Sequence, residues 1–170
     1  MEFTHESWAT GKQSRARTSK MAVSLICSET MSRVSSVLNR DAKQFGKKYM
    51  FDSNEETCWN SDQGAHQWVL LEFPRAATVS AVHVQFQGGF SARTCRVEGS
   101  LKEGTCVNMT DFYPEDNNSL QISFVTSLQS CFFPIQDSSL VDKLKIVFEN
   151  STDLFGRIIV YSLDVLGERA

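Results

Sequence analysis

The chain has 170 residues, a hydrophobic content of 41% and a formal net charge of −3. A domain usually spans roughly 100 to 200 residues, so this length fits one domain with a substantial core. The charge is too small to indicate a nucleic-acid-binding surface, or an anionic membrane, as the partner of the whole chain. The sequence has no apolar run of about 18 residues and no secretory signal, so we expect an intracellular protein without a transmembrane helix.

Residues 1–20 differ from the rest of the chain because they are polar, basic and aperiodic. Such a segment cannot bury an apolar face, so we predict a disordered extension, or an alternative start, over 1–20 and one domain over 21–170. Two interpretations of its basic residues stay open, nuclear import and a merely solvated tail. These residues are Lys12, Arg15, Arg17 and Lys20.

After Met21, apolar and polar residues alternate with a period of two, which is typical of half-buried strands. Val69, Leu71 and Phe73 show the pattern most clearly. Turns rich in Gly, Asn, Asp and Pro separate such segments, so we predict an all-β sandwich. The other predicted strands cover 33–38, 79–86, 94–101, 106–112, 121–126, 143–148 and 157–166, and two short helices are predicted over 42–50 and 138–142.

The five cysteines are odd in number, irregularly spaced and without a C-x-x-C pair. This pattern argues against a disulfide framework and against a zinc knuckle. We therefore predict buried free thiols. The cysteines are Cys27, Cys58, Cys95, Cys106 and Cys131.

The segment 51–62 combines an acidic turn with Trp59, and Trp68 opens the next strand. Asp52, Asn54 and Thr57 are turn formers that also carry hard oxygen donors. Each tryptophan is either a platform for stacking on a sugar or part of the core. Their places beside the turn and at a strand start favour packing in the core.

These residues match the opening pattern of a known superfamily: an acidic turn at Asp52, then Thr57-Cys-Trp59-Asn-Ser61, then the strand Trp68 to Phe73. The chain resembles the galactose-binding-like superfamily, which includes the discoidin and coagulation-factor type C domains. The resemblance implies a jelly-roll β-sandwich with one or two short helices.

A closer resemblance covers nearly everything after Met21. The chain is similar to a family of small vertebrate proteins associated with a testicular orphan nuclear receptor. Relative to that family, 122–131 looks like an insertion, for which we expect an extra edge strand or an exposed loop. The matching segments are 32–40, 44–48, 56–64, 86–90, 111–121, 155–157 and 166–168.

In calcium-binding members of the superfamily, the acidic turn meets a glutamate of the last strand. The corresponding residue here is Ser162, so one anionic ligand is missing. The resemblance thus implies at most a weak calcium site made of Asp52, Asn54, Thr57 and Ser162, and no other cofactor is expected. The alternative is that Asp52 and Asn54 cap a tight turn by accepting backbone N–H bonds.

Loops at the ends of a sandwich commonly carry its binding residues. Phe90 and Phe155 lie in glycine-containing turns, and Arg93 and Arg157 follow them closely. Exposed aromatic rings flanked by arginines suit a protein partner. We predict that these four residues bind a partner, and the alternative is that both rings fold back into the core.

The sequence has no phosphate-binding loop, no metalloprotease motif and no nucleophile motif near a histidine, so we expect a non-enzymatic protein. The resemblance implies a nuclear adaptor that binds the orphan receptor and represses its transactivation by blocking its binding to DNA response elements. With no basic face of its own, the domain is expected to act through protein contacts rather than on nucleic acid. The alternatives are a calcium- or carbohydrate-binding module, a scaffold subunit of a larger assembly, and a cytoplasmic location.

Overall fold

A computed structural model describes residues 22–114, 128–137 and 139–170. In these ranges the chain forms nine strands, and short helices separate β2 from β3. The strands are β1 (Val23–Ser24), β2 (Met31–Val34), β3 (Trp59–Asn60), β4 (His66–Gln87), β5 (Ala92–Ser100), β6 (Val107–Phe112), β7 (Leu128–Pro134), β8 (Leu140–Ser151) and β9 (Ile159–Arg169). The helices are the 3₁₀ helix η1 (Leu38–Arg40), the α-helix α1 (Ala42–Phe45) and the 3₁₀ helix η2 (Lys47–Met50). In the described part of the chain, no helix is long and apolar enough to cross a bilayer.

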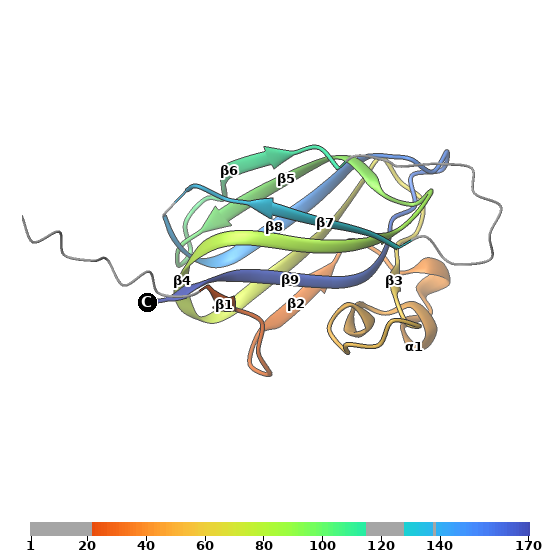
Figure 1. Ribbon diagram of the computed structural model, residues 1–170. Helices are drawn as coiled ribbons and strands as arrows, with labels where there is room; N and C mark the ends of the chain where they lie inside the picture. The colour runs from red at the N-terminus through yellow and green to blue at the C-terminus, as the bar shows by residue number, and fades with distance from the viewer. Residues whose placement is uncertain (1–21, 115–127, 138) are drawn as a thin grey trace, which may run out of the picture.

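Strand β4 takes part in both layers of a β-sandwich (Figure 1). Its first half pairs antiparallel with β2 and β8, and its second half pairs antiparallel with β9 and β7. The first layer continues from β8 through β5 to β6, and the second continues from β9 to β1 and β3. The predicted all-β sandwich is therefore confirmed.

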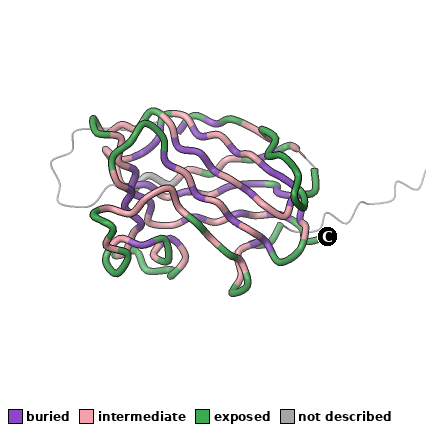
Figure 2. The backbone as a smooth tube through the Cα atoms, turned by 180° about the vertical axis from the view of Figure 1, so that it is seen from behind, coloured by how far each residue is buried: buried purple, intermediate pink, exposed green. Residues whose placement is uncertain are grey.

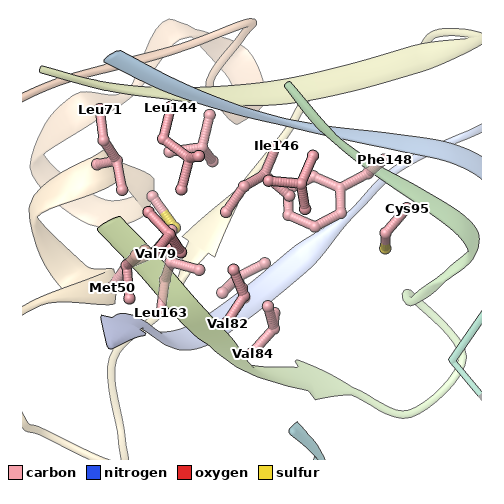
Figure 3. Packing of buried hydrophobic residues seen from close by; sticks show 14 of the residues in the cluster. Met50, Leu71, Val79, Val82, Val84, Cys95, Leu144, Ile146, Phe148 and Leu163 are labelled. Carbon is pink, nitrogen blue, oxygen red and sulfur yellow. The ribbon is translucent and has the colours of Figure 1, made fainter. Parts of the chain in front are cut away.

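The core lies between the layers, and the loops and short helices carry most of the exposed positions (Figure 2). Figure 3 shows Val82 and Val84 of β4 directed toward Ile146 and Phe148 of β8. All four side chains are at most 1% exposed. Burying apolar surface of this kind contributes roughly 25 cal/mol per Å², so this contact between the layers stabilises the sandwich.

A bulge in β4 changes which of its residues face the core. Val79 pairs with Gly167 of β9, and Ala81 pairs with the adjacent Leu166, so Ser80 has no partner in this ladder. One extra residue moves the following side chains to the opposite face. The inward positions therefore shift from Val79 to the even-numbered residues 82, 84 and 86.

Several predicted elements are confirmed, and two are wrong in part. The strands predicted over 94–101, 106–112, 143–148 and 157–166 are β5, β6, β8 and β9. The helix predicted over 42–50 is broken into α1 and η2 at Gly46, whose backbone is extended. The strand predicted over 33–38 ends at Val34, because the hydroxyl groups of Ser35 and Ser36 turn to donate to Gln67 Oε1.

The helix predicted over 138–142 is wrong, because β8 begins at Leu140, which pairs with Thr78. Asp137 Oδ1 accepts a hydrogen bond from Ser139 N at 2.8 Å. The strand predicted over 121–126 lies outside the described residues. At the end of the apparent insertion, β7 pairs with β4, as expected for an added strand.

The two tryptophans have different environments. Trp59 is fully buried, its ring lies 6.3 Å from that of Phe148, and its Nε1 donates to Ser36 O at 2.9 Å. The prediction of core packing is thus confirmed for Trp59. It is wrong for Trp68, which is half-buried on the outer face of the first layer with Lys145 Nζ 5.1 Å from its ring. Its neighbour Val69 takes the inward position, because successive strand residues point to opposite faces.

All five cysteines are free, but only Cys95 is fully buried, so the prediction of buried thiols holds for one residue. Burial raises the pKa of the Cys95 thiol well above its ordinary value, and burial also raises the pKa of Cys58. The pKa of the Cys27 thiol is lowered from its ordinary value, mainly by the hydrogen bond from the side chain of Thr30. The structure thus predicts an order of thiol reactivity.

We expect iodoacetamide to alkylate Cys27 at a lower pH than Cys58 or Cys95, because the thiolate is the reacting form and it appears at a lower pH when the pKa is lowered. Peptide mass analysis after timed alkylation at several pH values measures the three rates. Thr30→Val, which removes the hydroxyl group at 3.5 Å from Cys27 Sγ, should slow the reaction of Cys27 alone. Equal pH profiles for Cys27 and Cys58 would contradict the assignment.

Candidate functional site

The acidic turn after η2 holds itself together through its own oxygen atoms. Asp52 Oδ1 accepts from Asn54 N at 3.0 Å, and Asp52 Oδ2 accepts from the Thr57 hydroxyl group at 2.5 Å. Asn54 Oδ1 accepts from Glu56 N at 2.9 Å. Three of the four predicted calcium ligands are therefore engaged with one another and with the backbone, as in the capping alternative.

Ser162, the fourth predicted ligand, lies on β9 beside a shallow hollow of about 250 Å³. The acidic turn contributes Phe51 and Ser53 to this hollow, and Asp52, Asn54 and Thr57 are not among its lining residues. Asp164, also in the hollow, accepts a hydrogen bond from the Ser24 hydroxyl group at 2.6 Å. Among the described residues there is no group of three His, Cys, Asp or Glu side chains arranged to hold a metal ion. The calcium site stays a prediction, and the contacts seen here favour a structural role for the turn.

The turn between β8 and β9 lies at the loop end of the sandwich, opposite the C-terminus in Figure 1. Leu154 is 90% exposed and Phe155 is 61% exposed in the turn between β8 and β9. They border a broad, open depression of about 550 Å³ that the segment 63–65 completes. We call Leu154 and Phe155 the apolar tip. Isolated exposed apolar residues are ordinary, but two adjacent ones beside a depression are typical of a contact surface.

The apolar tip is held by hydrogen bonds on both sides. Asp153 Oδ2 accepts from Phe155 N at 3.2 Å and from Arg157 N at 3.0 Å. Gly64 N donates to Phe155 O at 3.2 Å, which joins the turn to the loop before β4. Gly156 has a φ of +83°, and a Cβ atom there would lie 2.0 Å from Gly64 O, so only glycine fits. The tip is therefore presented by a fixed backbone.

Behind the tip, Arg157 lies over the ring of Phe90, with its guanidinium carbon 5.0 Å from the ring centroid. Phe90 O accepts from Ile159 N at 3.1 Å, which anchors the β4–β5 turn to the start of β9. Two buried polar atoms in this region, Arg157 Nε and Ser91 Oγ, have no hydrogen-bond partner within the described residues. Unpaired buried polar groups are costly, so these two atoms mark a place where the packing of the loop end is not fully satisfied.

The structure brings together two of the four predicted partner-binding residues, Phe90 and Arg157, as a stacked pair. Phe155 is exposed, and Arg93 is exposed at the start of β5. Phe90 is half-buried, so neither ring is a plug in the core. Sequence reasoning missed Leu154 as a site residue, although an apolar pair between Asp153 and Gly156 is the signal that identifies it.

Asp52→Ala tests the role of the acidic turn. We expect the free energy of unfolding to fall by about 1 kcal/mol, because the backbone N–H of Asn54 and the hydroxyl group of Thr57 lose their acceptor. Urea unfolding measures this change, and Asp52→Asn, which keeps one acceptor, should lose less. Melting curves with calcium and with a chelator test the other role. A calcium-dependent rise in Tm that Asp52→Ala abolishes would identify a ligand, whereas identical curves leave only the cap.

The chain is similar over most of its length to a set of named vertebrate proteins, although no protein-family profile matches it. It is 67% identical to the nuclear receptor 2C2-associated protein of Danio rerio, over 88% of this chain and 99% of that protein. It is 56% identical to the protein of the same name from Homo sapiens, over the same shares of the two chains. With the protein of that name from Xenopus laevis it shares 59% identity, over 86% of this chain and 100% of the relative.

Solved structures show the same fold at low identity. An F5/8 type C domain from Bacteroides fragilis superposes with a TM-score of 0.70 at 13% identity, covering 88% of this chain and 99% of that domain. A chitosan-binding module from Paenibacillus gives 0.66 at 14% identity, over 85% and 99%. A family 32 carbohydrate-binding module from Clostridium perfringens, solved with galactose, gives 0.63 at 16% identity, over 86% and 98%.

These neighbours confirm the galactose-binding-like jelly-roll fold. Sequence identity at this low level shows that the fold is shared, but it does not show that a ligand is shared. The family assignment rests on the relatives that are more than 50% identical to this chain. This chain belongs to the family of nuclear receptor 2C2-associated proteins.

Proposed function

We propose that this chain is a non-enzymatic nuclear adaptor that binds nuclear receptor 2C2, the receptor in its relatives' name, through the apolar tip Leu154–Phe155. The observation that carries the proposal is the exposure of these two adjacent side chains on a fixed turn. A few apolar and aromatic anchors supply most of the binding energy of a typical protein interface. A backbone already held by Asp153 and Gly64 loses little conformational entropy on binding, which strengthens the contact.

Arg93 and the stacked pair Phe90–Arg157 extend the proposed contact around the tip. A guanidinium group on an aromatic ring offers a flat surface with donors at its edge, which suits a partner carrying carbonyl or carboxylate groups. Arg93 is exposed and adds positive charge at the rim of the loop end.

The proposed action is repression of the receptor by masking its DNA-binding surface. The chain has a net charge of −3, so it does not compete with the receptor for phosphate groups as a basic domain would. An adaptor that covers the receptor's own contact residues lowers DNA binding without touching DNA. This mechanism requires that the adaptor and the DNA exclude each other on the receptor.

Leu154→Ser combined with Phe155→Ser tests the contact surface. We expect capture of purified receptor to weaken by about 30-fold or more, because losing two anchors removes roughly 2 kcal/mol or more of binding energy. The matched control is Val107→Ser, which changes an apolar residue of β6 that is 65% exposed. Circular dichroism and Tm of both variants separate binding from folding. Undiminished capture by the double variant would place the contact elsewhere.

A mobility-shift titration with receptor and its labelled response element tests the mechanism. We expect the receptor–DNA band to decrease as the adaptor is added, with no slower band, because the adaptor and the DNA compete for one surface. The Leu154→Ser/Phe155→Ser variant should leave the band unchanged. A slower ternary band would show that adaptor and DNA bind together, which contradicts masking while leaving the receptor contact intact.

A further inference from the structure

A further hollow, of about 240 Å³, lies between β2 and η2 and shares no residue with the apolar tip. Its apolar walls come from Ile26, Phe51 and Leu71. Leu71 is fully buried, and the other two are partly buried against the core. We call this hollow the basic groove, because Lys47 and Lys48 complete its lining. In Figure 1, the helices around α1 lie below the sandwich and the β8–β9 turn lies above it at the same end. The basic groove and the depression at the apolar tip share no lining residue, so they are separate surfaces.

The residues that line the basic groove carry positive charge, in a chain whose net charge is negative. Its lining residues include two lysines and no acidic residue. The segment 31–51 contains five basic residues against Asp41, a local net charge of +4 in a chain of −3. Asp41 is occupied in capping α1, since its Oδ1 accepts from the N–H groups of Lys43 and Gln44. The basic residues are Arg33, Arg40, Lys43, Lys47 and Lys48, and all of them are exposed.

Lys47 is held at the groove by its own contacts. Its Nζ donates to the backbone oxygen of Ser32, another lining residue. An ammonium group has three donors, so the others remain for an anionic ligand. Lys48 Nζ lies 4.9 Å from the ring centroid of Tyr49. The cations are therefore positioned near the apolar walls rather than spread over a solvated face.

We infer that the basic groove binds a short acidic segment of a partner protein, with one bulky apolar side chain of that segment inserted between Ile26, Phe51 and Leu71. The volume is below the roughly 300 to 1,000 Å³ of small-molecule pockets, and it suits a single side chain of a peptide. Carboxylates on either side of that anchor meet Lys47 and Lys48. This inference is independent of receptor binding at the tip.

Nucleic acid fits the same surface less well. A polyanion gains nothing from apolar walls, because its affinity comes from a run of phosphate contacts. The acidic turn that follows the groove carries Asp52, Glu55 and Glu56, all exposed, and repels an extended phosphate backbone. A short peptide can place its charges beside the lysines and avoid that turn.

Fluorescence anisotropy with a labelled peptide tests the inference. The probe is a short peptide of aspartate and glutamate containing one leucine and one phenylalanine, and the comparison peptide has serine in both apolar places. We expect the full-length chain to bind the first peptide at least ten-fold more tightly than the second. Binding should weaken as salt is raised, because the lysines are exposed.

Two variants assign the binding to the groove. Lys47→Glu with Lys48→Glu should weaken binding of the first peptide at least ten-fold, and Ser32→Leu, which fills the groove without changing charge, should weaken it comparably. The matched control is Arg75→Glu with Lys102→Glu, which makes the same change in net charge on exposed residues of β4 and of the turn after β5. Circular dichroism and Tm are measured for every variant.

Three results would overturn the inference: no binding of the first peptide, equal binding of the two peptides, or equal weakening by the groove and control charge variants. Tighter binding of a DNA duplex than of the peptide, lost in Lys47→Glu/Lys48→Glu, would assign the surface to nucleic acid instead. None of these results bears on receptor capture by the tip, so the two proposals fail separately.

Discussion

Strand β4 is the constraint on which the rest of the structure depends, because it belongs to both layers of the sandwich. Its first half fixes β2 and β8, and its second half fixes β9 and β7. The bulge at Ser80 re-aims the strand so that both halves direct apolar side chains into one core. A change that shifts this register by one residue would move Val82, Val84 and Phe86 to the surface.

The loops at the loop end are held in place by the strands of this framework. The ends of β4, β8 and β9 define where the three loops begin, and hydrogen bonds then join the loops to one another. Ser61 is central, because its N–H donates to Ile158 O at 2.9 Å and its hydroxyl oxygen accepts from Ile158 N at 2.8 Å. A backbone tied in this way exposes Leu154 and Phe155 without the conformational cost that a free loop pays on binding.

Much of the fold could be predicted from the sequence, because period-two alternation and turn residues report burial directly. The fold also depends on events that local patterns do not encode. The bulge at Ser80 reverses, within one strand, which alternate side chains face the core. Trp68 faces outward because its neighbour Val69 takes the core position. The basic groove was beyond prediction for another reason: Ile26, Lys47 and Leu71 become neighbours only when β2 packs between η2 and β4. Leu154 is different, since an apolar pair between Asp and Gly was visible in the sequence.

This chain has the same fold as modules that bind sugars, and tryptophan rings can stack on sugars. The positions of its own tryptophans therefore bear on whether it binds one. In the described part of the chain, Trp59 is sealed in the core and Trp68 lies on the outer face of the first layer beneath Lys145. Neither presents a flat ring at the loop end, where stacking on a sugar would need one. The rings placed there are the exposed Phe155 and the half-buried Phe90, whose centroid is 5.0 Å from the guanidinium carbon of Arg157. An aliphatic and aromatic tip beside an arginine-stacked ring has the composition expected of the protein interface that we propose for this end of the sandwich.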